Sequence, residues 1–202
     1  MKVGEADKNP EPLCVRFINT VDWRDDPARR SDSLSSYAEL VRWARDAGAI
    51  SGAVASRLLH EAGRKAAAAQ AALHHAVTAR EAMASVLRAA ALKRQPPPAD
   101  LQRFNAALAE SGLHLRIAAG ESGFHCAWDT DDRLDRVLWP AVRSAADLLT
   151  SSHLERLRMC EGEGCGWFFM DNTRNRSRRW CNMAVCGNRA KVKRFYQRHK
   201  ES

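Results

Sequence analysis

The sequence predicts a mainly α-helical protein: a helical N-terminal domain with one β-hairpin, followed by a small C-terminal zinc finger. Most of the stretch from 36 to 152 shows apolar residues at helical spacing, and one pair of short alternating segments interrupts it. Four of the six cysteines then lie together near the C-terminus. A chain of 202 residues is long enough for one well-buried domain and a small second unit. We place the boundary so that the domains are 1–153 and 154–202.

The first helix of the N-terminal domain is expected between Ser36 and Gly48. Ser36 and Glu39 have the spacing of a capping box, and Gly48 follows the last residue of the apolar pattern. The face that this helix would bury carries Tyr37, Leu40, Val41 and Ala44.

Further helices are expected at 52–62, 64–94, 99–110 and 131–152. The stretch 64–94 is rich in Ala, and the prolines after Gln95 end it. Its predicted buried stripe contains Leu73, Val77, Ala84, Leu87 and Ala91. Pro140 is expected to kink the last helix or to start a new segment. The segments "LHLRIA" and "FHCAWD" flank "AGESG", which predicts the β-hairpin.

The cellular compartment decides how the cysteines are interpreted. No apolar run approaches the roughly 20 residues of a membrane-spanning helix, and the N-terminus lacks the apolar centre of a secretory signal. We therefore expect a cytoplasmic protein with no membrane partner, in which a disulfide framework is not favoured. Cys14 and Cys126 stand alone among apolar neighbours, and we expect both to be small buried hydrophobic residues.

The other cysteines, Cys160, Cys165, Cys181 and Cys186, form two Cys-x4-Cys pairs separated by 15 residues. Two such pairs can wrap four sulfurs around one tetrahedral ion and leave no position for water, which favours a structural site over a hydrolytic one. Soft thiolate ligands favour zinc, so we expect one structural Zn²⁺. An iron–sulfur cluster and unrelated buried thiols are the alternatives. Glycines at 162, 164, 166 and 187 suit the tight turns of such knuckles.

The finger is expected to combine a short hairpin with a helix. The segments 156–160 and 166–170 are expected to pair as a hairpin, which carries the first cysteine pair. A helix is expected from Gly187 to about Lys200. Its apolar stripe consists of Val192, Phe195, Tyr196 and His199. A hairpin knuckle joined to a knuckle at a helix start indicates a treble-clef-like finger.

Positive charge is concentrated in the same tail. Residues 151–202 hold 12 Lys and Arg against 5 Asp and Glu, a formal +7 that four thiolates around Zn²⁺ would reduce to about +5. From 174 to 200 there are ten basic residues and no acidic one that could neutralise them within the stretch. A solvated face, and arginines that merely offset the zinc thiolates, are competing explanations.

Arginine binds phosphate and guanine edges bidentately, so nucleic acid is the expected partner. DNA is favoured and RNA is the alternative. The predicted contacts are Arg174, Arg176, Arg178, Arg179, Asn188, Arg189, Lys191, Lys193, Arg194 and Arg198. Among them Asn188 and Arg189 lie at the start of the predicted helix, where base edges could be reached.

Two stretches carry a family resemblance. The segment "CEGEGCGWFFMDNTRNRSRRWCNMAVCGNRAKVKRFY" resembles the CGNR zinc finger, whose name is spelled by Cys186, Gly187, Asn188 and Arg189. The segment "LCVRFINTVDWRDDP" resembles the start of the ABATE domain that usually precedes this finger. The resemblance implies a bacterial transcription regulator of the stress-induced type, in which four cysteines hold zinc and the finger binds DNA.

The N-terminal domain offers no glycine-rich phosphate loop and no nucleophile elbow, so we expect no enzyme. A small-molecule effector could bind a pocket that combines an aromatic plate with hydrogen-bonding groups. The candidate residues are Asn19, Thr20, Asp22, Trp23 and Arg24. A capped loop packed on the core is the simpler explanation of this segment, and homodimerisation is another role for the domain. A zinc-stabilised protein adaptor and, more weakly, an enzyme in the helical domain are the alternative functions.

Overall fold

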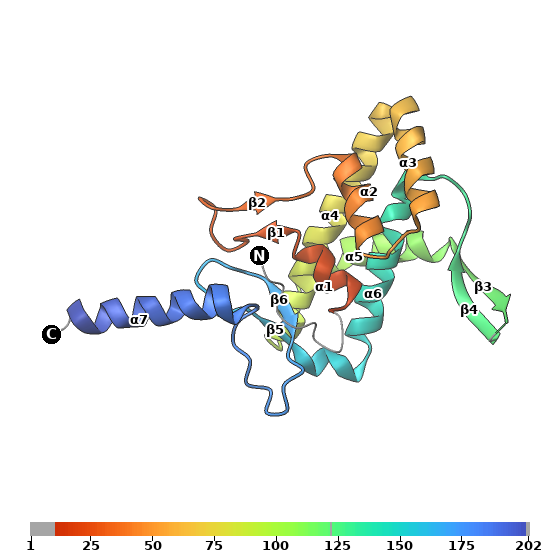
Figure 1. Ribbon diagram of the computed structural model, residues 1–202. Helices are drawn as coiled ribbons and strands as arrows, with labels where there is room; N and C mark the ends of the chain where they lie inside the picture. The colour runs from red at the N-terminus through yellow and green to blue at the C-terminus, as the bar shows by residue number, and fades with distance from the viewer. Residues whose placement is uncertain (1–10, 122, 201–202) are drawn as a thin grey trace.

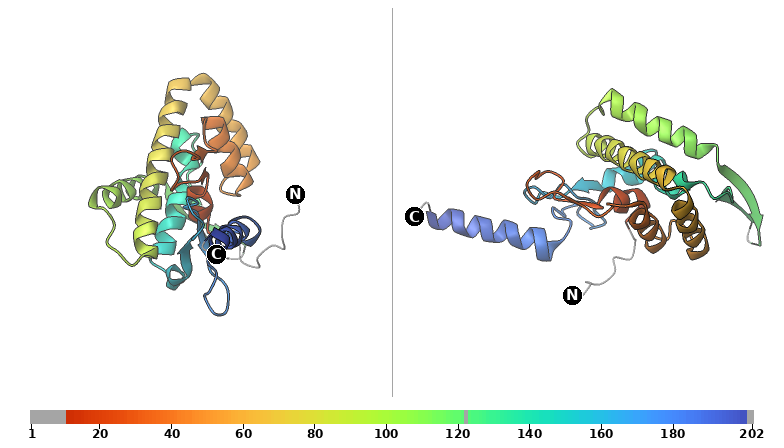
Figure 2. Two further views of the ribbon diagram at one scale, coloured as in Figure 1. Left: turned by 90° about the vertical axis from the view of Figure 1, so that its left-hand side faces the viewer. Right: turned by 90° about the horizontal axis from the view of Figure 1, so that it is seen from above.

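The computed structural model describes residues 11–121 and 123–200, and within them the fold is mainly α-helical, as predicted. The helical body contains α1 (Leu13–Ile18), α2 (Tyr37–Asp46), α3 (Gly52–Arg64), α4 (Ala66–Ala91), α5 (Pro98–Gly112) and α6 (Trp139–Leu149). Two features project from it at opposite ends (Figures 1 and 2). One is the hairpin of β3 (Leu115–Gly120) and β4 (Gly123–Trp128), and the other is α7 (Asn188–Lys200).

The central helix of the body is α4, which contacts α1, α2, α3, α5 and α6. Its small side chains, Ala72, Ala76 and Ala79 among them, are buried and let the neighbouring helices approach closely. In the predicted stripe, Leu73, Ala84 and Leu87 are buried, whereas Val77 and Ala91 are half-buried. A break at Lys65 separates α4 from α3, close to the predicted position.

A capping box starts α2, as predicted. The backbone N–H of Glu39 donates to Ser36 Oγ at 3.2 Å, and the Glu39 carboxylate accepts from the Ser35 N–H at 2.8 Å.

Pro140 lies in the first turn of α6 and so starts a segment rather than kinking one. The predicted helix 131–152 is therefore divided, with the short 3₁₀ helix η1 (Leu134–Val137) before α6 and η2 (Ser152–Arg156) after it. The short α1 had no counterpart among the predicted helices.

The predicted hairpin β3–β4 is present, with Leu115 opposite Trp128 and Ile117 opposite Cys126. It extends away from the helices (Figure 1), and Ile117 and Phe124 are 69% and 83% exposed. Cys126 is also exposed, so the expectation that it is buried is wrong, because this strand leaves the body. Cys14 is buried as expected, and burial raises its pKa to about 11.

Two further strand pairs are short and antiparallel. β1 (Val21–Asp22) pairs with β2 (Ser31–Asp32), and β5 (Leu157–Met159) pairs with β6 (Phe168–Met170). The fully buried Arg80 of α4 holds the β1–β2 segment through two bonds to the Asp32 carboxylate, at 2.8 and 2.5 Å, and one to Thr20 Oγ1 at 2.8 Å. Such a bidentate pair satisfies a buried guanidinium that would otherwise be costly.

The hairpin β5–β6 shares the main hydrophobic core. Leu157, Phe168 and Met170 are buried in the same cluster as the residues of α4, although all three lie in the segment predicted to be a separate finger. Among the described residues, the helices are too short or too polar to cross a bilayer.

Candidate metal centre and basic surface

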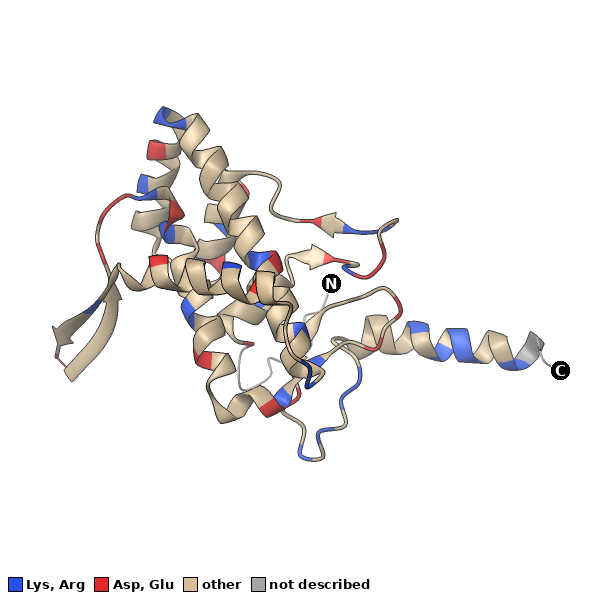
Figure 3. Cartoon of the chain, turned by 180° about the vertical axis from the view of Figure 1, so that it is seen from behind, with Lys and Arg blue, Asp and Glu red and all other residues tan. Residues whose placement is uncertain are grey.

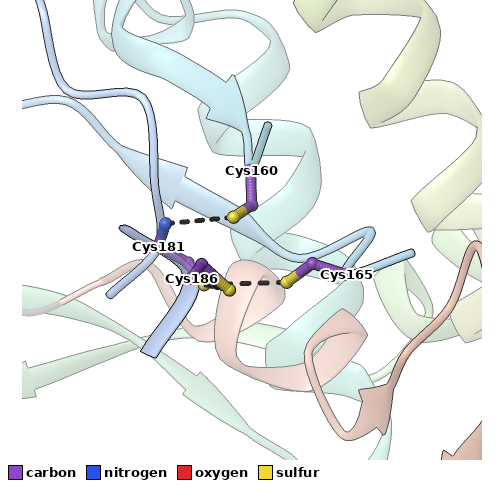
Figure 4. A group of neighbouring side chains, drawn as sticks. All are labelled: Cys160, Cys165, Cys181 and Cys186. Atoms are coloured by element: carbon purple, nitrogen blue, oxygen red, sulfur yellow. Dashed lines mark hydrogen bonds between the residues drawn. The ribbon is translucent and has the colours of Figure 1, made fainter. Parts of the chain in front are cut away.

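The four clustered cysteines converge on one point. Their Sγ atoms all lie within 4.8 Å of one another, and Figure 4 shows them pointing inward from two separate segments. The Sγ atom of Cys181 lies 3.7 Å from those of both Cys165 and Cys186. A tetrahedral Zn²⁺ with bonds of about 2.3 Å requires sulfurs about 3.8 Å apart. The donor set and its spacing therefore fit one zinc ion.

The four thiols lie close enough to alter one another's ionisation. A hydrogen bond from Cys165 lowers the pKa of Cys160 to about 2, and the reverse interaction raises that of Cys165 to about 12. The pKa of Cys181 is likewise raised by its bonds to Cys160 and Cys165. One thiolate thus suppresses ionisation of its neighbours. Four thiolates at this separation are stable together only around a positive ion.

The first knuckle is the turn between β5 and β6. Cys160 follows β5 and its N–H donates to Trp167 O at 2.8 Å, which continues the strand pairing up to the metal ligands. Gly164 and Gly166 adopt φ values of +70° and +66°, which disfavour any residue with a Cβ. A Cβ on Gly166 would lie 2.7 Å from Arg24 Cβ. These glycines therefore serve both the turn and the close approach of an N-terminal segment.

The second knuckle begins a helix, as predicted. Asn182 caps the π-helical turn η3 (Met183–Gly187), and its Oδ1 accepts from the N–H groups of Ala184 and Val185 at 2.8 and 3.2 Å. This cap presents Cys186 to the metal site and leads directly into α7. A hairpin knuckle and a helix-start knuckle together form the predicted treble-clef-like finger.

The ligand sulfurs accept hydrogen bonds from the surrounding protein. The backbone N–H groups of Gly162 and Cys181 donate to Cys160 Sγ, each at 3.4 Å. Arg189 Nη2 donates to Cys186 Sγ at 3.3 Å. Donors around a zinc thiolate centre offset its negative charge and orient the ligands.

An N-terminal segment docks against the first knuckle. The side-chain amide of Asn19 bonds to both the N–H and the carbonyl of Phe168, at 2.9 and 2.8 Å, as a neighbouring strand would. The N–H groups of Arg24 and Asp25 donate to Cys165 O and Gly164 O, at 3.1 and 3.3 Å. The Trp167 indole donates to Val21 O at 3.0 Å. The metal knuckle is therefore held by residues nearly 150 positions away in sequence.

This docking occupies much of the predicted effector pocket. Asn19 and the backbone of Arg24 contact the knuckle, while the Arg24 side chain bonds to Glu81 and to Ile18 O. Thr20 is buried and accepts a hydrogen bond from Arg80, whereas Asp22 is exposed. The Trp23 ring stacks on the guanidinium groups of Arg29 and Arg189. A small hollow of about 200 Å³ does border Asp22 and Trp23, between this segment and the knuckles. An effector pocket at these residues remains a prediction.

Acidic residues outside the basic stretch 174–200 neutralise part of its charge. Arg176, Arg179 and Lys193 form exposed ion pairs with Glu155, Glu161 and Glu163, at 2.9, 2.5 and 2.6 Å. These pairs were not predicted, because the basic stretch itself holds no acid and the partners lie before it, Glu161 and Glu163 inside the first knuckle.

Two other predicted contacts are held by the finger itself. Arg178 donates to the carbonyls of Trp180 and Cys181, and Arg189 bonds to a ligand sulfur. The remaining predicted residues are exposed on the loop after β6 or on α7, both of which carry several Lys and Arg (Figure 3): Arg174, Asn188, Lys191, Arg194 and Arg198. Arg194 Nε donates to Ala190 O, and Asn188 to Ala184 O.

A basic groove of about 450 Å³ lies between the first knuckle and α7. Five basic side chains line it against two acidic ones: Arg29, Arg179, Arg189, Lys193 and Arg194 against Glu161 and Glu163. Arg29 comes from the β1–β2 segment and was not among the predicted contacts, because its spacing in the sequence gives no sign that it approaches the finger.

Fold and site together define a protein with a helical N-terminal domain and a four-cysteine zinc finger. The family model described as "Putative stress-induced transcription regulator" (ABATE) matches residues 11–152, and the model of the CGNR zinc finger matches 156–199. The chain thus belongs to the ABATE family, as the resemblance implied, and its four clustered cysteines are the ligands of one structural zinc. A comparison with curated proteins found no match.

Proposed function

We propose that this chain is a DNA-binding transcription regulator whose finger contacts duplex DNA. The observation that supports this most directly is the basic groove between the first knuckle and α7, where five cationic side chains outnumber two glutamates beside the metal site. Phosphate contacts from such side chains supply most of the non-specific affinity of DNA-binding proteins.

The exposed face of α7 extends this basic surface. Lys191, Arg194 and Arg198 are exposed and spaced at i, i+3 and i+7, which places them on one side of the helix. Arg174, on the loop after β6, adds a further exposed cation. The helix projects from the body of the molecule (Figure 1).

The projecting helix favours DNA over RNA as the partner. An α-helix is about 10–12 Å across with its side chains, and the major groove of B-DNA is about 12 Å wide. The major groove of duplex RNA is too narrow for side chains to read. A helix of 13 residues is about 20 Å long, enough to lie across one groove.

Salt dependence tests the proposal. If about four phosphates are neutralised, the slope of log affinity against log salt should be about −4, and Arg194→Ala should make it shallower by about one unit. Arg64→Ala is the matched control, because Arg64 is an exposed arginine of α3 outside the groove lining. Binding is measured to duplex DNA at several salt concentrations. Absent binding at low salt with zinc in place would reject the proposal.

One observation supports the alternative of a protein adaptor. Four apolar side chains on η3 and α7 are between 54% and 64% exposed: Val185, Val192, Phe195 and Tyr196. The last three belong to the apolar stripe predicted from the sequence. Exposed apolar side chains at helical spacing suit a protein partner. Replacing Val192 and Tyr196 by Ser should leave the salt slope for DNA unchanged, whereas it would abolish capture of a protein partner.

A further inference from the structure

Arg189 makes two contacts at once. Its Nη2 donates to Cys186 Sγ at 3.3 Å, and its Cζ lies 4.0 Å from the centre of the Trp23 ring. The Cζ of Arg29 lies 3.7 Å from the same ring centre. Two guanidinium groups cannot occupy one face of a ring at these distances, so Trp23 lies between them. The side chain of Arg189 therefore bridges a metal ligand and the N-terminal domain.

Trp23 is held in a constrained conformation at this contact. Its φ is +53°, in the left-handed region that large residues rarely adopt. The Trp23 carbonyl accepts from the Asp26 N–H at 2.9 Å, and the next residue, Arg24, bonds to Cys165 O. Such a backbone persists only where the surrounding contacts fix it. The indole thus presents a fixed surface to the first turn of α7.

We propose that Arg189 is a positioning residue: by joining the zinc-bound thiolate of Cys186 to Trp23, it sets the direction in which α7 leaves the body. Its guanidinium is then engaged with protein and does not read base edges. The geometry suits a planar cation with several donors, because one edge reaches sulfur while the face covers an indole; an ammonium group has no flat face to stack on the ring. This inference depends on bound zinc and does not depend on DNA binding.

The direction of α7 can be measured with nitroxide labels on zinc-loaded protein. Labels are placed at Gln197→Cys on α7 and Arg64→Cys on α3 in a Cys126→Ser background, and pulsed electron paramagnetic resonance gives their distance distribution. We expect Arg189→Ala to broaden this distribution at least twofold, and Arg189→Lys to do nearly the same. The matched control, Lys191→Ala, changes an exposed cation in the same turn and should leave it unchanged.

Cobalt substitution provides a spectroscopic signature of the sulfur contact. Removing a hydrogen bond from Cys186 makes that thiolate a better electron donor, so Arg189→Ala should move the thiolate-to-cobalt charge-transfer band to longer wavelength. Lys191→Ala should not. Arg189→Gln keeps an N–H donor without the planar cation, so it should retain metal yet still broaden the label distances. A distribution that stays narrow in both Arg189→Ala and Arg189→Gln would overturn the proposal, whatever the DNA affinity.

Discussion

Two glutamates in the first knuckle reduce the charge that the finger presents. Glu161 and Glu163 are exposed, and they pair with Arg179 and Lys193 at the lip of the basic groove. The hydrogen bond from Lys193 lowers the pKa of Glu163, so this carboxylate stays ionised at neutral pH. Any phosphate that approaches Lys193 must therefore compete with a carboxylate already in place.

Glu163→Gln should consequently tighten DNA binding at low salt. Removing the competing carboxylate frees Lys193, and an exposed pair of this kind should change affinity by about two- to fivefold. The difference should diminish at high salt, where surface charges are screened. Glu61→Gln is the matched control, because Glu61 pairs with Lys65 at the same 2.6 Å distance but on α3. Equal affinities of the Glu163→Gln variant and the parent protein would show that Lys193 does not contact phosphate.

Gly166→Ala should weaken the docking of the N-terminal segment on the knuckle. The substitution places a Cβ 2.7 Å from Arg24 Cβ at a φ of +66°, and the strain alone costs about 1–2 kcal/mol. Thermal unfolding of the zinc-loaded protein measures the loss. Gly63→Ala should instead preserve or raise stability, because Gly63 lies in α3 with open space around it. The prediction fails if both variants unfold at the temperature of the parent protein.

At the scale of elements, the hairpin β5–β6 is part of both the zinc site and the hydrophobic core. Its turn supplies two zinc ligands, while Leu157, Phe168 and Met170 are buried in the core around α4. Loss of zinc should therefore affect the two knuckles differently. The first is held by the core and by Asn19, whereas the second is anchored by Cys181, Cys186 and the Asn182 cap.

Cys181→Ser is expected to disorder η3 and the start of α7 while β5 and β6 remain formed. Hydrogen exchange should show rapid exchange after residue 181, retained protection of Phe168 and Met170, and less than one zinc per chain. Cys126→Ser, which removes an exposed cysteine of the β3–β4 hairpin, should keep both the zinc and the protection. Loss of protection throughout the helical body would show that zinc stabilises the whole fold.

Short sequence patterns predicted the helices and the metal ligands of this molecule better than they predicted how these parts pack together. The cysteine spacing identified the four ligands, and helical periodicity placed α2 to α5 within a few residues, because both signals are contained in short windows. The contacts of Asn19 and Arg29 with the finger connect residues more than 100 positions apart. They depend on chain trajectory, which no short window contains. For the same reason the burial of Arg80 and the exposure of Cys126 were not predictable.

At the scale of the whole molecule, the two matched segments share one core and a hydrogen-bonded seam. The ABATE match ends at residue 152 and the finger match begins at 156, yet the seam joins Asn19, Val21 and Arg24 to the first knuckle. The helical body thus supplies part of the zinc site's support. The sequence places a domain boundary between residues 153 and 154. Side chains from both sides of this boundary pack in one core.

A fragment of residues 154–202 should accordingly bind zinc much more weakly than the whole chain. Exposing Leu157 and Phe168 forfeits about 1.5–3 kcal/mol for each side chain, and metal binding must then compensate for folding the knuckles. A net loss of about 3 kcal/mol corresponds to roughly a hundredfold lower affinity. Competition with a chelator measures this difference, and Leu157→Ala in the intact chain should reproduce part of it. A fragment that matches the intact chain in zinc affinity would mean that the finger folds without the helical body, despite the buried side chains that the two share.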